Sequence, residues 1–369
     1  MTEESNCKNL THLSENDSPA IAAVMFSAGV VGNLIALVLL ETRRREFRGN
    51  ISLFFILVSG LVVTDLLGTC MISPVVMAAY ARRLSLVEMG LCKYFAFAMT
   101  FFSLATMMIL FATALERALA IGHPYFYEKF IKKRCGVITF PIIYGFSIFF
   151  CLFPLMNFGE FIQYCPGTWC FIDMKSRNTG SNLSNVYSMF YATLLLILII
   201  AVLTCNLVVI VNLVRMHKRQ KTRRIGSINA NKRDRISMSE EIDHLILLSI
   251  MTITFIICSL PFTIRAYINR AASDVGADAM DLLALRFLSV NSIIDPWIFT
   301  ILRPSVLRVM RSVIYCQTSL NNQSISNYPS LNTHLTASTK LHIDNTYGSS
   351  GAKILADGDK IAWGEKTDI

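Results

Sequence analysis

The sequence predicts an all-α integral membrane protein, a bundle of seven membrane-spanning helices. Of its 369 residues, 53% are hydrophobic and only 16% are charged, a balance that is too apolar for a soluble domain of this length. Seven runs of about 20 or more mostly apolar residues divide the chain, and each is long enough to cross a bilayer as a helix. The runs cover residues 19–40, 51–80, 91–121, 135–155, 186–214, 243–267 and 282–302.

Lysine and arginine residues collect in alternate loops, and this sets the expected orientation of the bundle. Basic clusters follow the first, third and fifth runs, at residues 43–48, 129–134 and 215–235, whereas the loops between them carry few. Basic loops stay in the cytoplasm, so we expect the amino terminus outside and the carboxyl terminus inside. The net charge of +9 then belongs to the cytoplasmic face, where anionic lipid or a cytosolic partner explains it better than nucleic acid.

The segments outside the bundle differ from it in composition. Residues 1–18 form a polar extracellular tail without signal-peptide features, ahead of the bundle and its loops at residues 19–302. Residues 303–316 predict a short amphipathic eighth helix on the inner leaflet, with Cys316 as a palmitoyl anchor. Residues 317–369 are polar and aperiodic, which predicts a disordered cytoplasmic tail open to phosphorylation. Three glycosylation motifs are expected on the outer side, at Asn9, Asn16 and Asn182.

The last run sets one arginine and one aspartate, Arg286 and Asp295, into an apolar helix. Placing either charge at the centre of a membrane helix costs about 2.5 to 3.5 kcal/mol, so each of the two residues predicts a functional site. A rise of about 1.5 Å per residue puts Asp295 roughly 13 Å deeper than Arg286, so the two are not partners. Leu282, Arg286 and Ser289 recur at i, i+4 and i+7 and would form one wall for a ligand that is part apolar and part acidic. The alternative is that Arg286 snorkels to the lipid headgroups.

A second aspartate, Asp65, lies in the middle of the second run. If Asp65 and Asp295 face each other, both cannot ionise without a cation or a shared proton, so a sodium ion or a proton is implied near Asp65. Thr106, Asn291 and Asn33 could supply neutral oxygens to the same cavity. The alternative is that hydroxyls and amides satisfy each carboxylate separately.

Charged residues also mark the cytoplasmic ends of two runs. Glu116 and Arg117 end the third run, and Glu241 lies near the start of the sixth, so Arg117 could be shared between the two glutamates as a lock between helices. The alternative is a solvated pair at a helix end, worth about 0 to 1 kcal/mol. Pro261 in the sixth run removes a backbone hydrogen bond, and the resulting kink would let that helix pivot.

Most of the ten cysteines lie singly in apolar runs and are expected to act as small hydrophobic residues. Cys92, Cys165 and Cys170 lie on the outer side, where a disulfide can persist. A bridge from Cys92 to Cys170 would fold the outer loop down over the mouth of the bundle. Cys165 would then be left to pair with Cys7 in the amino-terminal tail.

These features together resemble those of the rhodopsin-like G protein-coupled receptors, over residues 19–316. The segments PGTWCFI at residues 166–172 and LRFLSVN at residues 285–291, followed by Asp-Pro-Trp, look like signatures of the prostanoid receptor family. Residues 94–106 and 122–127 are most similar to the members that bind prostaglandin E2, with those for prostaglandin D2 next.

The resemblance implies a plasma-membrane receptor, not an enzyme, that signals through Gs to raise cyclic AMP, with arrestin and receptor kinases acting at the tail. It implies that Arg286, Thr168 and Tyr80 hold a prostaglandin carboxylate. Further residues expected in the ligand pocket are Trp169, Ser27, Leu282 and Ser289. Ala118 departs from the family, which usually carries an aromatic residue or cysteine after Glu116 and Arg117.

Other classes lack their defining residues here. An opsin needs a Schiff-base lysine where Ser289 stands, and an amine receptor needs an acidic residue within residues 92–115, which contain none. A membrane transporter of lipid carboxylates would usually show paired, interrupted helices in inverted repeats, and the seven runs show no self-similarity. The alternatives that remain are a receptor for another prostanoid, such as prostaglandin D2, and such a transporter.

Overall fold

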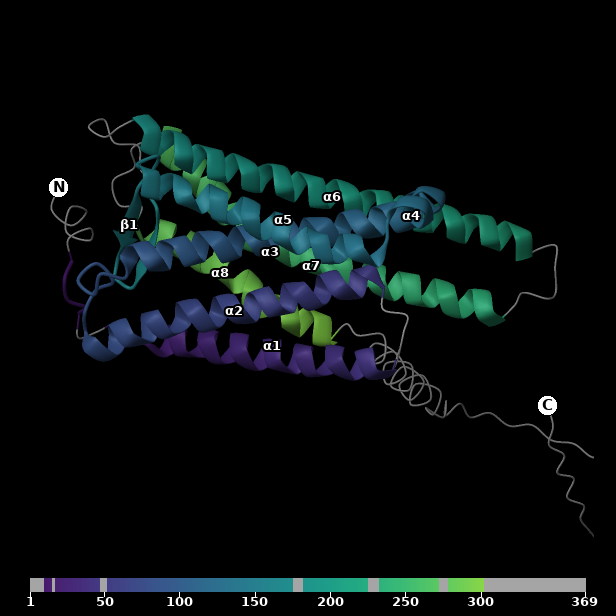
Figure 1. Ribbon diagram of the computed structural model, residues 1–369, viewed down its shortest axis with the longest axis horizontal. Coiled ribbons are helices and arrows are strands. Elements are labelled where there is room, and N and C mark those ends of the chain that lie inside the picture. The colour runs from purple at the N-terminus through teal and green to yellow at the C-terminus, as the bar shows by residue number, and fades with distance from the viewer. Residues whose placement is uncertain are drawn as a thin grey trace, which may run out of the picture. The chain divides into compact units, whose positions relative to one another are not determined.

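The computed structural model describes residues 10–14, 17–46, 52–174, 182–224, 232–271 and 278–301. Within these residues the chain forms seven long helices that run side by side as a bundle (Figure 1). The long helices are α1 (Ala20–Glu46), α2 (Leu53–Arg82), α3 (Cys92–Gly122), α5 (Lys133–Leu152), α6 (Asn182–Arg224), α7 (Lys232–Ala271) and α8 (Asp278–Ile301). The shorter elements are α4 (Pro124–Phe130), a 3-10 turn η1 (Phe153–Met156), β1 (Phe161–Tyr164) and β2 (Trp169–Ile172).

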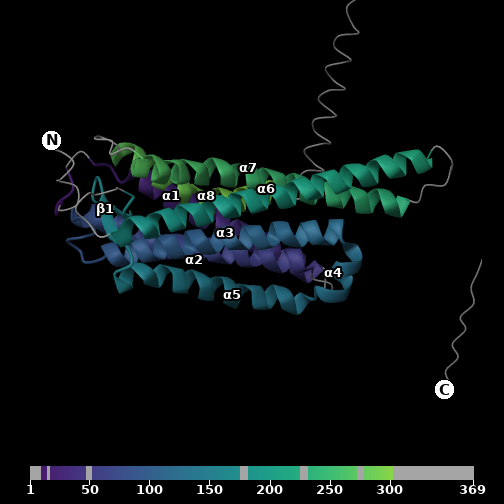
Figure 2. The ribbon, with the colours of Figure 1, turned by 90° about the horizontal axis from the view of Figure 1, so that it is seen from above.

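Each of the seven apolar runs forms a helix, as predicted. In the described part of the chain, six of the helices are long and apolar enough to cross a membrane, and α8 is the seventh long helix, with Asp281, Arg286 and Asp295 among its residues. Helices α6 and α7 continue beyond their apolar runs and project past the other helices (Figures 1 and 2). Their extensions are rich in lysine and arginine, which are good helix formers that need no burial.

Helix α3 lies at the centre of the bundle, against α2, α5, α6 and strand β2 (Figure 2). Helix α1 packs between α2 and α8, and α7 packs between α6 and α8. Buried aromatic and aliphatic side chains such as Phe95, Leu104 and Ile109 of α3 fill the core between them. This arrangement brings α1, α2, α3 and α8 around one space, in which the candidate site lies.

The two-stranded sheet is a departure from the predicted all-α fold. Strands β1 and β2 pair antiparallel in the loop between α5 and α6, with Tyr164 opposite Trp169, and Gly167 takes a positive φ of 103° in the turn. A backbone bond ties this hairpin to the loop after α2, because Leu86 N donates to Gly167 O at 2.9 Å, and that loop is in turn bonded to the amino-terminal segment, since Ser85 N donates to Thr11 O at 2.8 Å. We call this end of the bundle the hairpin end; α4 lies at the opposite end, the α4 end (Figure 1).

Several predicted features fall outside the described residues and stay predictions. They are Cys7, Asn9, Asn16, the amphipathic helix with Cys316, the tail at residues 317–369, and the side chains of Asn182 and Glu241.

Gly32 of α1 allows a close approach between α1 and α8. A Cβ atom at Gly32 would lie 2.6 Å from Nε1 of Trp297, and that ring nitrogen is fixed by a hydrogen bond of 3.1 Å to Ala28 O. We predict that Gly32→Ala lowers the free energy of unfolding by about 1 to 3 kcal/mol, because the indole must move and lose its acceptor. Thermal unfolding of the purified protein measures the effect. Gly145→Ala is the matched control, since no atom lies within 4 Å of its Cβ, and an equal loss there would contradict the prediction.

Candidate ligand cavity and the polar sites around it

A cavity lies between α1, α2, α3, α8 and strand β2, with an empty volume of about 830 Å³ that includes space open to solvent. Its walls are mainly apolar, with Met25, Val76 and Phe95 among them, and hydroxyls such as those of Ser73 and Ser103 interrupt them. An apolar pocket with few polar groups suits a molecule that is mostly hydrocarbon.

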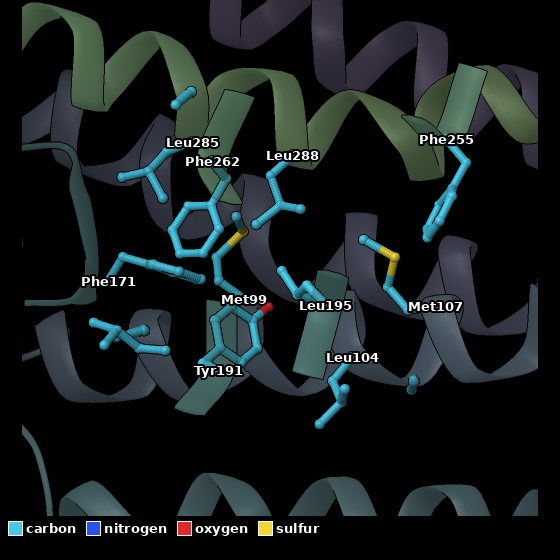
Figure 3. Close-up of a cluster of buried hydrophobic side chains, with 14 of the residues drawn as sticks. Met99, Leu104, Met107, Phe171, Tyr191, Leu195, Phe255, Phe262, Leu285 and Leu288 are labelled. Atoms are coloured by element: carbon cyan, nitrogen blue, oxygen red, sulfur yellow. The ribbon is translucent and has the colours of Figure 1, made fainter. Parts of the chain in front are cut away.

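A cluster of buried side chains closes the cavity toward α6 and α7 (Figure 3). Met99 and Leu288 belong both to the cavity wall and to this cluster. Behind them the rings of Phe171, Tyr191 and Phe262 meet edge to face, with centroids 5.4 to 5.9 Å apart. Such pairs contribute about 0.5 to 1.5 kcal/mol beyond their buried area, so this wall is firmly held. A ligand that displaced Met99 or Leu288 would press on Phe262 of α7.

Arg286 is not among the residues that line the cavity, but it shares a face of α8 with two residues that do. Ser289 and Ile293 line the cavity, and Arg286 shares their helix face at i−3 and i−7, one turn nearer the hairpin end. Its side chain is partly buried and, among the described residues, makes no ion pair or side-chain hydrogen bond. An unpaired arginine beside an apolar cavity is equipped to receive an anion. Leu282 is buried in the core and does not line the cavity.

Of the other residues expected in the ligand pocket, Trp169 lines the cavity, while Thr168, Tyr80 and Ser27 are not among its lining residues. Thr168 is fully buried and its hydroxyl oxygen has no hydrogen-bond partner, a state that costs about 1 to 3 kcal/mol. Trp169 lines the cavity and packs edge to face on Phe95 at 5.8 Å, and Tyr80 is partly buried against the core. Ser27 is exposed, because α1 turns the face that carries Ala22 and Met25 toward the cavity.

A disulfide between Cys92 and Cys170 joins the start of α3 to strand β2. This confirms the predicted bridge, and it explains how Trp169 is held against the cavity. Cys165 is also disulfide-bonded. Its expected partner, Cys7, lies outside the described residues, so that pairing stays a prediction.

The floor of the cavity is polar and carries unpaired acceptors. Asp65, Thr106 and Asn291 all line it, and the Thr106 hydroxyl donates to Asp65 Oδ1 at 2.8 Å. Asp65 Oδ2 and both carboxylate oxygens of Asp295 are buried without a partner, so the two carboxylates are not separately satisfied. The Asn33 amide nitrogen donates to Gly29 O and Ser292 O, and its Oδ1 is a further buried oxygen without a partner among the described residues.

Comparisons with known proteins show the family to which the chain belongs. Residues 32–299 match the family described as 7 transmembrane receptor (rhodopsin family). The chain is 56% identical to the mouse prostaglandin E2 receptor EP2 subtype, over 86% of this chain and 90% of that protein. It is 44% identical to the human prostacyclin receptor, over 84% of this chain and 79% of that protein.

The chain belongs to the prostanoid receptors of the rhodopsin family. They are multi-pass membrane receptors and not enzymes, and squid rhodopsin shares the fold, with a TM-score of 0.67, 15% identity, and coverage of 79% of this chain and 78% of that one.

At the α4 end, the prostanoid receptor carries a buried charge cluster. Arg117 donates to Glu116 through Nε at 2.5 Å and Nη2 at 2.7 Å, and its guanidinium lies 4.5 Å from the centroid of the Phe54 ring. Tyr127 of α4 also donates to Glu116, at 2.6 Å. The Glu116 side chain is only 3% exposed, so this is not the solvated pair considered as an alternative. Burial and the bond to Glu116 raise the pKa of Tyr127 well above its ordinary value, so its hydroxyl keeps the donated proton.

Two features of these sites were missed at the level of sequence. Tyr127 joins the Glu116 cluster from α4, which is too short to show a periodic signal. Arg265 of α7 forms an ion pair with Asp281 of α8 at 2.8 Å. The argument that singled out Arg286, a charge within an apolar run, would have found Arg265 as well.

The disulfide generates a testable prediction. Cys92→Ser should lower the free energy of unfolding by roughly 2 to 5 kcal/mol and loosen the hairpin, because the bridge closes a separation of 78 residues. Thermal unfolding together with hydrogen exchange at residues 161–172 measures both effects. Cys70→Ser is the control, since Cys70 is free and exposed. Unchanged exchange in the Cys92 variant would show that the hairpin holds without the bridge.

Proposed function

We propose that this prostanoid receptor binds prostaglandin E2 from the hairpin end, which faces outside, and signals through Gs to raise cyclic AMP. The observation that carries the proposal is Arg286, a cation that has no partner among the described residues and that shares a face of α8 with Ser289 and Ile293 of the cavity wall. Support for prostaglandin E2 comes from the relatives, because the identity to the E2 receptor is 56% and the identity to the prostacyclin receptor is 44%.

The chemistry of a prostaglandin fits the two kinds of surface in this site. Its hydrocarbon chains would be buried against Met25, Val76 and Phe95, at roughly 25 cal/mol per Å² of apolar area. Its carboxylate would accept a bidentate pair from Arg286 and a hydrogen bond from the Thr168 hydroxyl, which has no partner in the protein. Tyr80 would complete this carboxylate site. The keto and hydroxyl groups of the ring would find partners in the wall hydroxyls.

Signalling would use the polar floor and the α4 end. We expect Asp65 and Asp295 to share a sodium ion or a proton, since three of their four oxygens have no partner. Agonist would let α7 pivot at Pro261 and free Arg117 for Gs, and Glu241 is the expected second partner of Arg117 in the inactive state. Receptor kinases and arrestin would act on residues 317–369.

One experiment tests the proposal and separates the other prostanoids. Cyclic AMP is measured in cells that express the receptor, with prostaglandins E2, D2, I2 and F2α added side by side. The expected result is a response to prostaglandin E2 at the lowest concentration. A response led by prostaglandin D2 or I2 would reassign the ligand. Uptake of labelled prostaglandin into vesicles, without a cyclic AMP response, would support a transporter instead.

The role of Arg286 gives a prediction for binding. Arg286→Ala should weaken binding of prostaglandin E2 roughly tenfold to a hundredfold, because a charge-assisted hydrogen bond contributes about 1.5 to 3 kcal/mol. Arg286→Lys should recover only part of the affinity, since lysine keeps the charge but loses the bidentate fork. Radioligand binding at matched surface expression measures both variants. Wild-type affinity in the alanine variant would place the carboxylate elsewhere.

The cluster around Glu116 gives a prediction for basal signalling. Tyr127→Phe removes one donor to Glu116, worth about 1 kcal/mol, so the active population should rise several-fold. Ligand-independent cyclic AMP per surface receptor measures this rise. Tyr125→Phe is the matched control, because Tyr125 is on the same helix and 89% exposed. An equal rise in both variants, or none in Tyr127→Phe, would show that Tyr127 does not restrain the inactive state.

A further inference from the structure

A buried charge cluster joins α7 to α8 near the hairpin end, outside the ligand cavity. Arg265 donates through Nε to Asp281 Oδ1 at 2.8 Å and through Nη2 to Asn269 Oδ1 at 2.8 Å. Asn269 in turn donates to both oxygens of Asp281, at 3.0 Å each. The Asp281 side chain is fully buried and that of Arg265 is 13% exposed. Each carboxylate oxygen therefore has a donor, and the pair is geometrically complete.

Asp281 and Arg286 point to different sides of α8. Asp281 shares a helix face with Leu285 and Leu288, at i+4 and i+7, and both leucines are buried in the core. Leu288 also lines the cavity. Arg286 lies five residues along from Asp281, roughly 140° around the helix, on the side that carries Ser289 and Ile293 of the cavity wall. A contact that fixes the direction of Asp281 therefore also fixes the direction of Arg286.

The partner segment of α7 is itself held in place. Tyr267 lies between Arg265 and Asn269 in the sequence, and its hydroxyl is 2.9 Å from the hydroxyl of Thr193 in α6. One turn deeper, Pro261 interrupts the backbone hydrogen bonds of α7. The segment from Arg265 to Asn269 is thus a fixed support on the hairpin side of the proline, against which α8 is oriented.

We propose that Asp281, through Arg265 and Asn269, is a positioning residue for Arg286. The cluster sets the rotation of the first turns of α8, so that Arg286 lies on the side of the helix that carries Ser289 and Ile293 of the cavity wall. It also occupies Arg265, so that Arg286 is the free arginine among the described side chains of α7 and α8. This inference rests on the proposed function, in which the cavity takes up a carboxylate.

The test compares prostaglandin E2 with its methyl ester on the full-length receptor in membranes. The ester keeps the hydrocarbon and ring contacts but carries no charge for Arg286. Asp281→Asn should weaken binding of the acid roughly tenfold and that of the ester much less, because a misaligned guanidinium loses charge-assisted bonds. Glu88→Gln is the control, since Glu88 is an exposed acid at the same end of the bundle.

Three further variants separate positioning from general stability. Asp281→Asn together with Arg265→Gln leaves no unpaired buried charge, so it keeps the test usable if the single variant folds poorly. The swap of Arg265→Asp with Asp281→Arg should restore the preference for the acid, because the Asn269 amide can flip to serve either arrangement. In an Arg286→Ala background, Asp281→Asn should cause no further loss of acid affinity, since the two residues act on one contact.

Each other outcome overturns the inference. An equal loss for acid and ester would mean that the cluster only stabilises the bundle. Tighter binding of the acid by Asp281→Asn would mean that the released Arg265 is itself an anion receiver. Unchanged binding by Asp281→Asn, with a wild type that binds the acid, removes the positioning role and leaves the proposed function intact. A wild type that binds neither ligand overturns the proposed function and this inference with it.

Discussion

The burial of charge inside an apolar bundle is the constraint on which the rest of this structure depends. A charged side chain within the membrane costs several kcal/mol unless a partner or a ligand compensates it. Arg265 is compensated by Asp281, and Arg117 by Glu116, each at 2.8 Å or less. Arg286 has no such partner among the described residues, although it lies in the same apolar bundle. The compensated arginines hold helices in place, and the uncompensated one marks the site for an anion.

Helix α8 connects these elements, because its faces have different tasks. One face carries Asp281 and packs on α7, and another carries Arg286 together with Ser289, which lines the cavity. A ligand bound to Arg286 would therefore exert a force on α8. Through the ion pair between Asp281 and Arg265, the same ligand would also exert a force on α7. The second route from cavity to α7 runs through Leu288 to Phe262, which lies next to Pro261 (Figure 3). Both routes meet α7 within about one turn of the proline, where a helix bends most easily.

The parts of the structure that the sequence predicted are those set by one helix at a time. Length and hydropathy predicted the seven helices, and the wall proposed from Arg286 included Ser289, which lines the cavity. The ion pair between Arg265 and Asp281 depends on how two helices are rotated against each other, which the periodicity of either helix alone does not determine. The hairpin has strands of four residues, too short for an alternation signal, and its position depends on the Cys92 disulfide and on bonds to distant loops. The prediction that Ser27 lies in the ligand pocket was wrong, although the periodicity of α1 alone was enough to exclude it. Ala22 and Met25 line the cavity, and Ser27 lies on a different face of the same helix.

The distribution of unpaired polar atoms distinguishes the functional groups from the structural ones. Buried polar atoms in proteins are usually hydrogen-bonded, so each exception calls for a physical reason. Among the described residues, such atoms occur on Thr168 next to Trp169 of the cavity wall, on Asp65 and Asn291 in the cavity floor, on Asn33 of α1 and on Asp295 of α8. Those on Ser147 of α5 and Asn206 of α6 lie away from the cavity, and nothing in the structure explains them. The unpaired atoms at the cavity are distributed along it from the hairpin to the floor. The free-energy cost of burying them without hydrogen bonds is offset only when a ligand, an ion or a proton occupies the site. The same groups that destabilise the empty bundle are therefore the ones that, in the proposed function, would bind the ligand carboxylate and a cation or proton.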